Sequence, residues 1–212
     1  MIKVIIIDDR VIRQEKILSE KSLNLKNLSN LQNVSGGEKC GKLLDEIHSS
    51  RFDFIDEFNT ICIHRSALTS KARNEIISYL SESNKKLIFF SGGISGSEYS
   101  FLKGLDFLLI DVENFYSENL IYFLENNAEN ILEIAFGENW QLSLLLDTLE
   151  KIIFYTRSYS EKPFVIFKND LNLNNWVISK FFPNVSDKDM IQKSCLDEFI
   201  KGLRNEINNA ML

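Results

Sequence analysis

The sequence predicts an α/β fold with a doubly wound, five-stranded parallel sheet, followed by a mostly helical C-terminal extension. Apolar runs of strand length alternate five times with amphipathic helical stretches over residues 1–125. The opening run over residues 4–7 is aliphatic without a polar break, which is typical of a strand buried on both faces. Beyond about residue 126 the alternation stops and helical patterns prevail. We therefore expect two domains, 1–125 and 126–212.

The first predicted strand, "VIII", runs directly into Asp8 and Asp9. The other four strands are expected in "LQNVSGG" (31–37), in "TICI" (60–63, or to His64), in "KKLIFFSGG" (85–93) and in "DFLLIDVEN" (106–114, with the strand ending at Asp111). Parallel strands need crossover connections, and these are right-handed. The segments between the strands should therefore form helices on both faces of the sheet.

Helices are predicted in the early part of residues 11–31 and over residues 38–50, 68–84 and 117–127. The stretch "SGSEYSFLKGL" (95–105) is expected as a short helix capped by Ser95 or Ser97, because a serine hydroxyl accepts a hydrogen bond from a free amide of the first turn. Ser117 is the expected cap of the following helix.

The C-terminal region is predicted to be helical over residues 128–159, 174–182 and 187–212, with one isolated strand in "PFVIFKN" (163–169). The first of these helices carries an apolar stripe that comprises Leu142, Leu145, Leu146, Leu149, Ile152 and Ile153.

The composition is that of a folded protein outside the membrane. The formal net charge of −6 leaves no basic stripe for phosphate neutralisation, so we do not expect a nucleic-acid partner. No stretch reaches the roughly 18 apolar residues of a membrane span, and we expect no signal peptide. Cys40, Cys62 and Cys195 are isolated and odd in number, which favours reduced thiols in a cytoplasmic protein.

Polar side chains follow four of the predicted strands at one edge of the sheet. They are Asp8 and Asp9, His64, Ser91 and Asp111. In open α/β sheets this carboxyl edge is where ligands bind. The motifs "VIIIDD" and "FFS" followed by glycine, together with the order of elements, resemble the receiver domain of two-component response regulators, a flavodoxin-like fold, over residues 1–125.

The resemblance implies a site that this sequence matches only in part. In receivers the acidic pair holds Mg²⁺, an Asp after the third strand accepts a phosphoryl group, and a Ser or Thr and a Lys follow the fourth and fifth strands. Asp8 and Asp9 match the pair, which makes Mg²⁺ a candidate cofactor, and Ser91 matches the hydroxyl. His64 and Asp111 stand where the acceptor Asp and the Lys are expected.

These two differences predict a degenerate receiver, or pseudo-receiver, without phosphotransfer of its own. An imidazole cannot form the acyl phosphate, and a carboxylate cannot contact the phosphoryl oxygens as a cation does. The insertion "RFDFIDEF" before the third strand leaves Asp53, Asp56 or Glu57 as alternative acceptors. His64, Ser91, Gly92, Gly93 and Asp111 would then form a vestigial or ligand-binding site.

Each of these residues also has a purely structural interpretation. Asp8 and Asp9 can end a strand and solvate a turn, a backbone carbonyl can satisfy His64, and Asp111 can cap a helix. The glycine-rich stretch "SGGISGS" (91–97) can cradle an anion at a helix start or form a flexible turn.

The leading hypothesis is a regulatory signalling protein, not an enzyme, that acts through a protein partner, with a second copy of the chain as a further candidate partner. Aromatic residues near the fourth and fifth strands offer either an interface or core packing, namely Phe89, Tyr99, Phe101, Phe107, Phe115 and Tyr116. One alternative is a Mg²⁺-dependent phosphohydrolase or nuclease that uses Asp8, Asp9 and Asp111, with His64 as general acid or base. Another is a sensor of a small anionic ligand.

Overall fold

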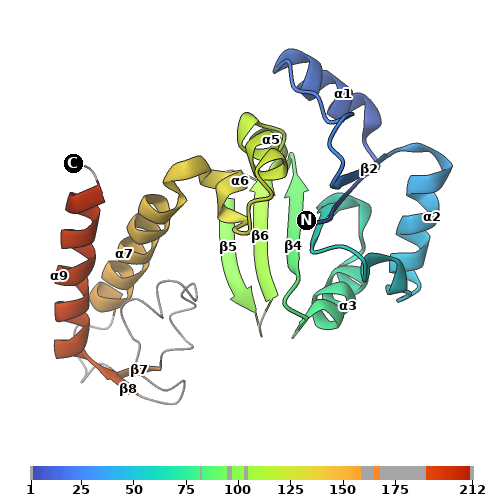
Figure 1. Cartoon of the computed structure of the whole chain (residues 1–212). Coiled ribbons are helices and arrows are strands. Elements are labelled where there is room, and N and C mark those ends of the chain that lie inside the picture. Colours follow the sequence, from blue (N-terminus) through green and yellow to red (C-terminus); the bar gives the residue numbers. More distant parts are fainter. Residues whose placement is uncertain are drawn as a thin grey trace. The chain divides into compact units, whose positions relative to one another are not determined.

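A six-stranded, mostly parallel sheet forms the centre of the first part of the chain (Figure 1). This computed structural model describes residues 2–81, 83–94, 97–102, 105–158, 165–167 and 190–210. The chain divides into two compact units, Met1–Gly137 and Glu138–Leu212. The predicted boundary after residue 125 stays a prediction.

Five strands of the sheet are parallel and lie where the sequence predicts them. They are β1 (Val4–Asp8), β2 (Leu31–Ser35), β3 (Thr60–His64), β4 (Lys86–Ser91) and β6 (Leu105–Asp111), in the spatial order β2-β1-β3-β4-β6. The α/β class with a mostly parallel sheet is thus confirmed. The predicted count of five strands is wrong, because a sixth strand lies beyond β6.

The sixth strand, β5 (Ser97–Leu102), replaces the short helix that we predicted over residues 95–105. It pairs antiparallel with β6, and Leu102 is opposite Leu105. Only two residues separate these strands in the sequence, which is the length of a tight hairpin connection. Glu98 is exposed, whereas Tyr99 and Ser100 are buried. Ser97 is therefore a strand residue and not a helix cap.

The helices α1 (Val11–Glu20), α2 (Gly37–His48) and α3 (Ser70–Leu80) connect strands of the sheet. The helices α4 (Val112–Phe115), α5 (Glu118–Glu125) and α6 (Leu132–Phe136) follow its last strand in the sequence, β6. Short 3₁₀ turns lie at Asp53–Ile55 and Arg65–Ala67. Ser117 precedes α5 as predicted, but its side chain makes no capping hydrogen bond.

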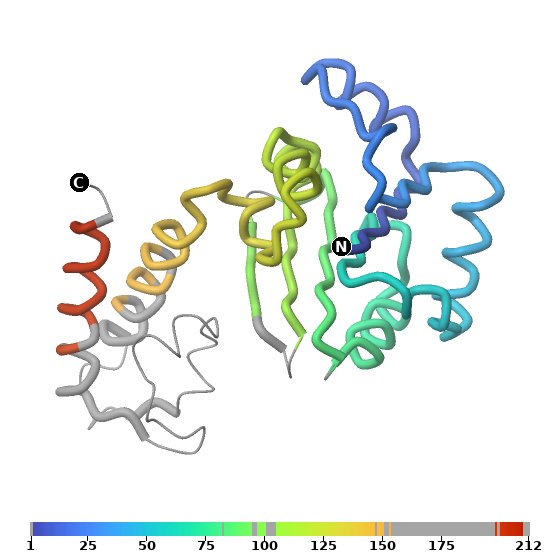
Figure 2. The backbone as a smooth tube through the Cα atoms, in the orientation of Figure 1, coloured from blue at the N-terminus to red at the C-terminus, as the bar shows by residue number. Residues whose placement is uncertain are grey.

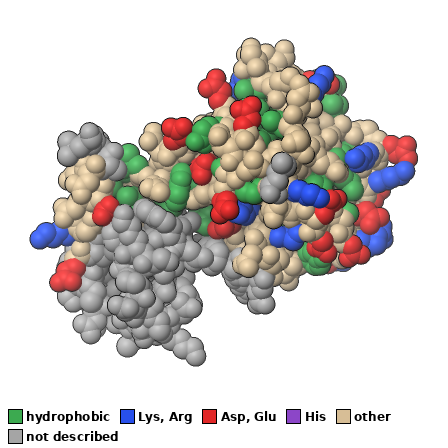
Figure 3. Space-filling model, viewed as in Figure 1, with side chains coloured by type: hydrophobic (Ala, Val, Ile, Leu, Met, Phe, Trp, Pro, Cys, Tyr) green, Lys and Arg blue, Asp and Glu red, His purple; other side chains and the backbone are tan. Residues whose placement is uncertain are grey.

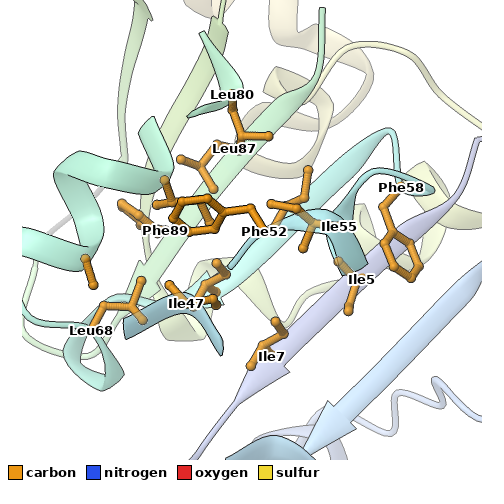
Figure 4. Packing of buried hydrophobic residues seen from close by; sticks show 14 of the residues in the cluster. Ile5, Ile7, Ile47, Phe52, Ile55, Phe58, Leu68, Leu80, Leu87 and Phe89 are labelled. Carbon is orange, nitrogen blue, oxygen red and sulfur yellow. The ribbon is translucent and has the colours of Figure 1, made fainter. Parts of the chain in front are cut away.

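One face of the sheet packs against α2 and α3 (Figure 4). Alternate strand residues such as Ile5, Ile7 and Phe89 lie there against Ile47 of α2 and Leu80 of α3. Burying side chains of this size contributes roughly 1.5–3 kcal/mol each. This cluster anchors β1 and β3 against α2 and α3, and thereby positions the carboxyl ends of the two strands.

The other face of the sheet is also covered by buried side chains, among them Phe90, Phe115 and Tyr116. The ring of Phe90 stacks on Phe115 with a centroid distance of 4.3 Å and meets Tyr116 edge-on at 5.6 Å. Four of the aromatic residues that we considered for an interface, Phe89, Tyr99, Phe115 and Tyr116, are buried. Their position supports the core-packing interpretation.

The short 3₁₀ turn η3 (Gly137–Asn139) spans the boundary between the two units, and the second unit contains two long helices and a short strand pair. The helices α7 (Trp140–Ser158) and α9 (Lys193–Ala210) pack side by side, and β7 (Val165–Phe167) pairs antiparallel with β8 (Met190–Gln192) (Figures 1 and 2). The predicted strand at 163–169 is confirmed in β7. The helix predicted from residue 187 begins only at Lys193, after β8. The helix predicted over residues 174–182 lies outside the described residues. Leu146, which belongs to the predicted apolar stripe, is 43% exposed.

Charges of both signs are interspersed on the face of the first unit shown in Figure 3. No helix within the described residues is long and apolar enough to cross a membrane. Cys40 and Cys62 are buried and unpaired, and burial raises the pKa of both thiols.

Candidate functional site at the carboxyl edge of the sheet

The register of the strands brings the predicted polar residues to one edge. Asp8 ends β1, His64 ends β3, and Ser91 of β4 is directly opposite Asp111 of β6. Asp8, Asp9 and His64 contact one another, whereas Ser91 and Asp111 each have other partners.

Asp8 is the centre of the first group and is completely buried. Its carboxylate accepts hydrogen bonds from the backbone N–H of Arg10 at 2.9 Å and from the hydroxyl of Tyr116 at 2.9 Å. The guanidinium of Arg13 donates to the same carboxylate, with Nη2 3.2 Å from Oδ1. A buried carboxylate with three such donors is a satisfied ion.

His64 joins Asp8 to Asp9. Its Nδ1 contacts Oδ1 of Asp9 and lies 3.8 Å from Oδ1 of Asp8. Its Nε2 lies 3.2 Å from Nη1 of Arg13. A guanidinium only donates, so Nε2 must accept and the ring proton must sit on Nδ1, which donates to Asp9. The contacts of His64 therefore define one neutral tautomer of the ring.

Arg13 holds this arrangement together, and the sequence analysis missed it. It is the third residue of α1 and lies within the first turn, and its guanidinium contacts both Asp8 and His64. Arg10 adds a second contact, with Nε 3.5 Å from Oδ2 of Asp9. Two guanidinium groups thus face two carboxylates, and the protein itself balances the charges of Asp8 and Asp9.

Tyr116 and Gln14 extend the network into the core and were also missed. Nε2 of Gln14 donates to the Tyr116 hydroxyl at 2.7 Å and lies 3.2 Å from Oδ1 of Asn33 in β2. Burial, with Asp8 as a further cause, raises the pKa of Tyr116 well above its usual value. The hydroxyl therefore remains a donor to Asp8.

Ser91 and Asp111 form hydrogen bonds outside the network of Asp8, Asp9 and His64. The hydroxyl of Ser91 lies 3.2 Å from that of Ser66, and the N–H of Gly93 donates to it at 3.4 Å. The carboxylate of Asp111 accepts from the N–H of Glu113 at 2.9 Å and caps α4. This geometry supports the capping interpretation of Asp111.

The glycine-rich segment does not lead into a helix. Gly92 and Gly93 follow β4, and the next described element is β5. The helix dipole that an anion cradle at Gly92 and Gly93 would use is therefore not available among the described residues. A Cβ on Gly92 would lie 3.5 Å from Cγ1 of Val112.

The alternative acceptors lie at the amino end of the strands, because they precede β3. Glu57 pairs with Lys3, just before β1, at 3.0 Å, and Asp56 accepts from the hydroxyl of Tyr79 at 2.9 Å. Asp53 begins the turn before them. At the carboxyl edge it is His64 that ends the third strand.

Asp8, Asp9 and His64 each offer one ligand atom, and these atoms lie within 4.8 Å of one another. The donor set suits a divalent ion, since carboxylate and imidazole are common ligands. The contacts do not suit it. Arg13 donates to Asp8 and His64, while the protonated Nδ1 of His64 faces Asp9, so a cation would have to displace these bonds. As they stand, the residues do not fit a bound Mg²⁺.

Comparisons with known proteins found no matching family model, no curated relative and no solved structure.

Proposed function

We propose that this chain is a regulatory protein whose first unit is a receiver-like module that binds a protein partner without Mg²⁺ or phosphorylation. The observation that carries the proposal is the guanidinium of Arg13, which bonds to Asp8 and His64 at the place where receivers hold a cation. An internal cation fills the electrostatic role of the metal and makes it dispensable.

The strand order supports the receiver-like interpretation. The five parallel strands lie in the order β2-β1-β3-β4-β6. If β6 is counted as the fifth parallel strand, this is the order 2-1-3-4-5 of flavodoxin-like sheets. The acidic pair lies at the carboxyl end of the first strand and a serine ends the fourth, as the resemblance implies.

The chemistry of the edge supports the absence of phosphotransfer. Asp53, Asp56 and Glu57 are at the opposite end of the strands, so the position of the acceptor falls to His64. Its Nδ1 and Nε2 are both engaged by neighbouring side chains. Asp111 supplies a helix cap where the resemblance would place a lysine.

Thermal unfolding with Mg²⁺, with and without the phosphoryl mimic beryllofluoride, tests this proposal. A ligand at 100 times its Kd adds about 2.7 kcal/mol to the stability, which raises the melting temperature by several degrees. We expect no rise with Mg²⁺ alone or with the mimic. A rise with the mimic would contradict the proposal and indicate a working acceptor.

A double variant serves as the positive control. Replacing Arg13→Gln and His64→Asp removes the internal cation and places a carboxylate after the third strand. We expect this variant to melt lower than the wild type but to gain stability with Mg²⁺. A double variant that folds and still ignores Mg²⁺ would show that Arg13 is not what closes the site.

The closeness of Asp8, Asp9 and His64 favours one second candidate, a metal-dependent hydrolase. Asp111, which we considered as its third carboxylate, caps α4 instead. A rise in the melting temperature of the wild type with Mg²⁺ or Mn²⁺ alone would favour this candidate over the interaction module.

A further inference from the structure

A groove of about 720 Å³ runs along the edge of the sheet formed by β2. Its walls are α1, the segment after it and β2 itself. Leu18, Leu23, Leu25 and Leu31 contribute apolar side chains to its lining, and Gln32 and Asn33 add amide groups. Gln14 and Asn33, which continue the hydrogen-bond network of Asp8, also line this groove. The function proposed above rests on Arg13, Asp8 and His64 and does not use the groove.

The open side of β2 presents backbone groups to this groove. Among the described residues β2 pairs only with β1. The carbonyl of Asn30 accepts from the backbone N–H of Val4 at 2.8 Å, and the N–H of Gly36 donates to the backbone carbonyl of Asp8 at 2.8 Å. Alternate residues of a parallel strand bond to the same neighbour, so the backbone groups of Asn33 and Ser35 point away from β1.

This edge lacks the features that keep sheet edges apart. The sequence of β2, Leu-Gln-Asn-Val-Ser, contains no charge and no proline. At the opposite edge, β5 carries the exposed charge of Glu98. Natural sheets guard free edges with charges, prolines or bulges, because an unguarded edge pairs with another strand. The composition of β2 is therefore that of a strand with a partner.

We propose that β2 pairs antiparallel with β2 of a second copy of this chain, so that the two sheets become one continuous sheet. A two-fold axis makes such pairing antiparallel and places the same groups on both sides. Because β2 is uncharged, no like charges come to lie opposite each other.

The rim of the groove also suits a second copy. It carries Glu15 and Lys26, which are exposed and make no ion pair within the described residues. The surface thus offers one charge of each sign, and two copies related by a two-fold axis can satisfy both. A strongly acidic or basic partner would satisfy only one.

Sedimentation equilibrium of the full chain over the micromolar range tests this proposal. We expect the mass to rise with concentration from 24.5 kDa toward twice that value. Gln32→Lys places a charge on the uncharged pairing edge of both copies, as natural sheets do to prevent pairing, and should raise the Kd of the dimer on the order of tenfold. Gln141→Lys, the same change on the exposed surface of α7, should leave the Kd unchanged.

Hydrogen exchange locates the contact independently of the mass. The amides of Asn33 and Ser35 should become protected as the concentration of the wild type rises, and should stay unprotected in Gln32→Lys. A wild type that remains monomeric throughout would overturn the proposal, and so would a dimer that Gln32→Lys leaves intact. Neither result depends on Mg²⁺ or on Arg13, so a failure here is distinct from a failure of the proposed function.

Discussion

At the scale of single residues, the carboxylate of Asp8 is the most constrained group of the carboxyl edge. It is fully buried, and its donors come from Arg13 in α1 and from Tyr116, which follows α4. A buried carboxylate that loses one donor keeps the cost of its desolvation, about 1–3 kcal/mol. The stability of the first unit should therefore depend on each of these donors.

Tyr116→Phe tests that dependence. We expect it to lower the free energy of unfolding by about 1–3 kcal/mol, measured by urea denaturation, because Asp8 and Gln14 both lose a partner. Tyr79→Phe is the matched control, since the hydroxyl of Tyr79 donates to Asp56 on the surface. Equal losses in the two variants would contradict a special role for Tyr116.

The same variant has a predictable pH dependence. The folded-state pKa of Tyr116 is raised, so its contribution is complete below the ordinary pKa of about 10 and is lost as the pH rises above that value. The wild type should therefore lose stability above that pH more steeply than Tyr116→Phe.

At the scale of elements, the sequence predicts strands better than it predicts what lies between them. β1, β3 and β4 are almost entirely buried, and an apolar run of strand length is a direct sign of this environment. β5 was missed because its serines resemble helix caps, while its pairing with β6 depends on a neighbour that comes later in the chain. Local propensity cannot register that pairing.

Helix caps show the same difference between residue type and actual contact. Oγ1 of Thr69 accepts from the N–H of Ala72 at 3.2 Å and caps α3, whereas Oγ of Ser117 is buried without a hydrogen-bond partner among the described residues. We expect Thr69→Ala to cost about 1 kcal/mol of stability and Ser117→Ala to cost nothing or to stabilise slightly. Chemical denaturation of the two variants side by side checks this, and a larger loss for Ser117→Ala would contradict it.

At the scale of the whole molecule, the sequence predicted the acids of the edge but not the cation that closes it. Asp8, Asp9 and His64 follow strands, and strand ends are readable from the chain. Arg13 lies inside a helix with no motif around it, and its single signal is a position one turn after the acidic pair. Tyr116 is 108 residues from Asp8, so only the folded chain brings them together.

The central claim is that Arg13 occupies the place of a metal ion beside Asp8 and His64. The protonation of the two ring nitrogens of His64 is the property whose measurement tests this claim most directly. ¹⁵N NMR distinguishes the two tautomers, and the chain has only two histidines to assign. We predict a neutral ring with the proton on Nδ1 and with Nε2 as acceptor, unchanged on addition of Mg²⁺ or Zn²⁺. Arg13→Gln should shift the Nε2 resonance because its donor is lost. A proton on Nε2 in the wild type, or a ring signal that moves on addition of a metal, would contradict the account.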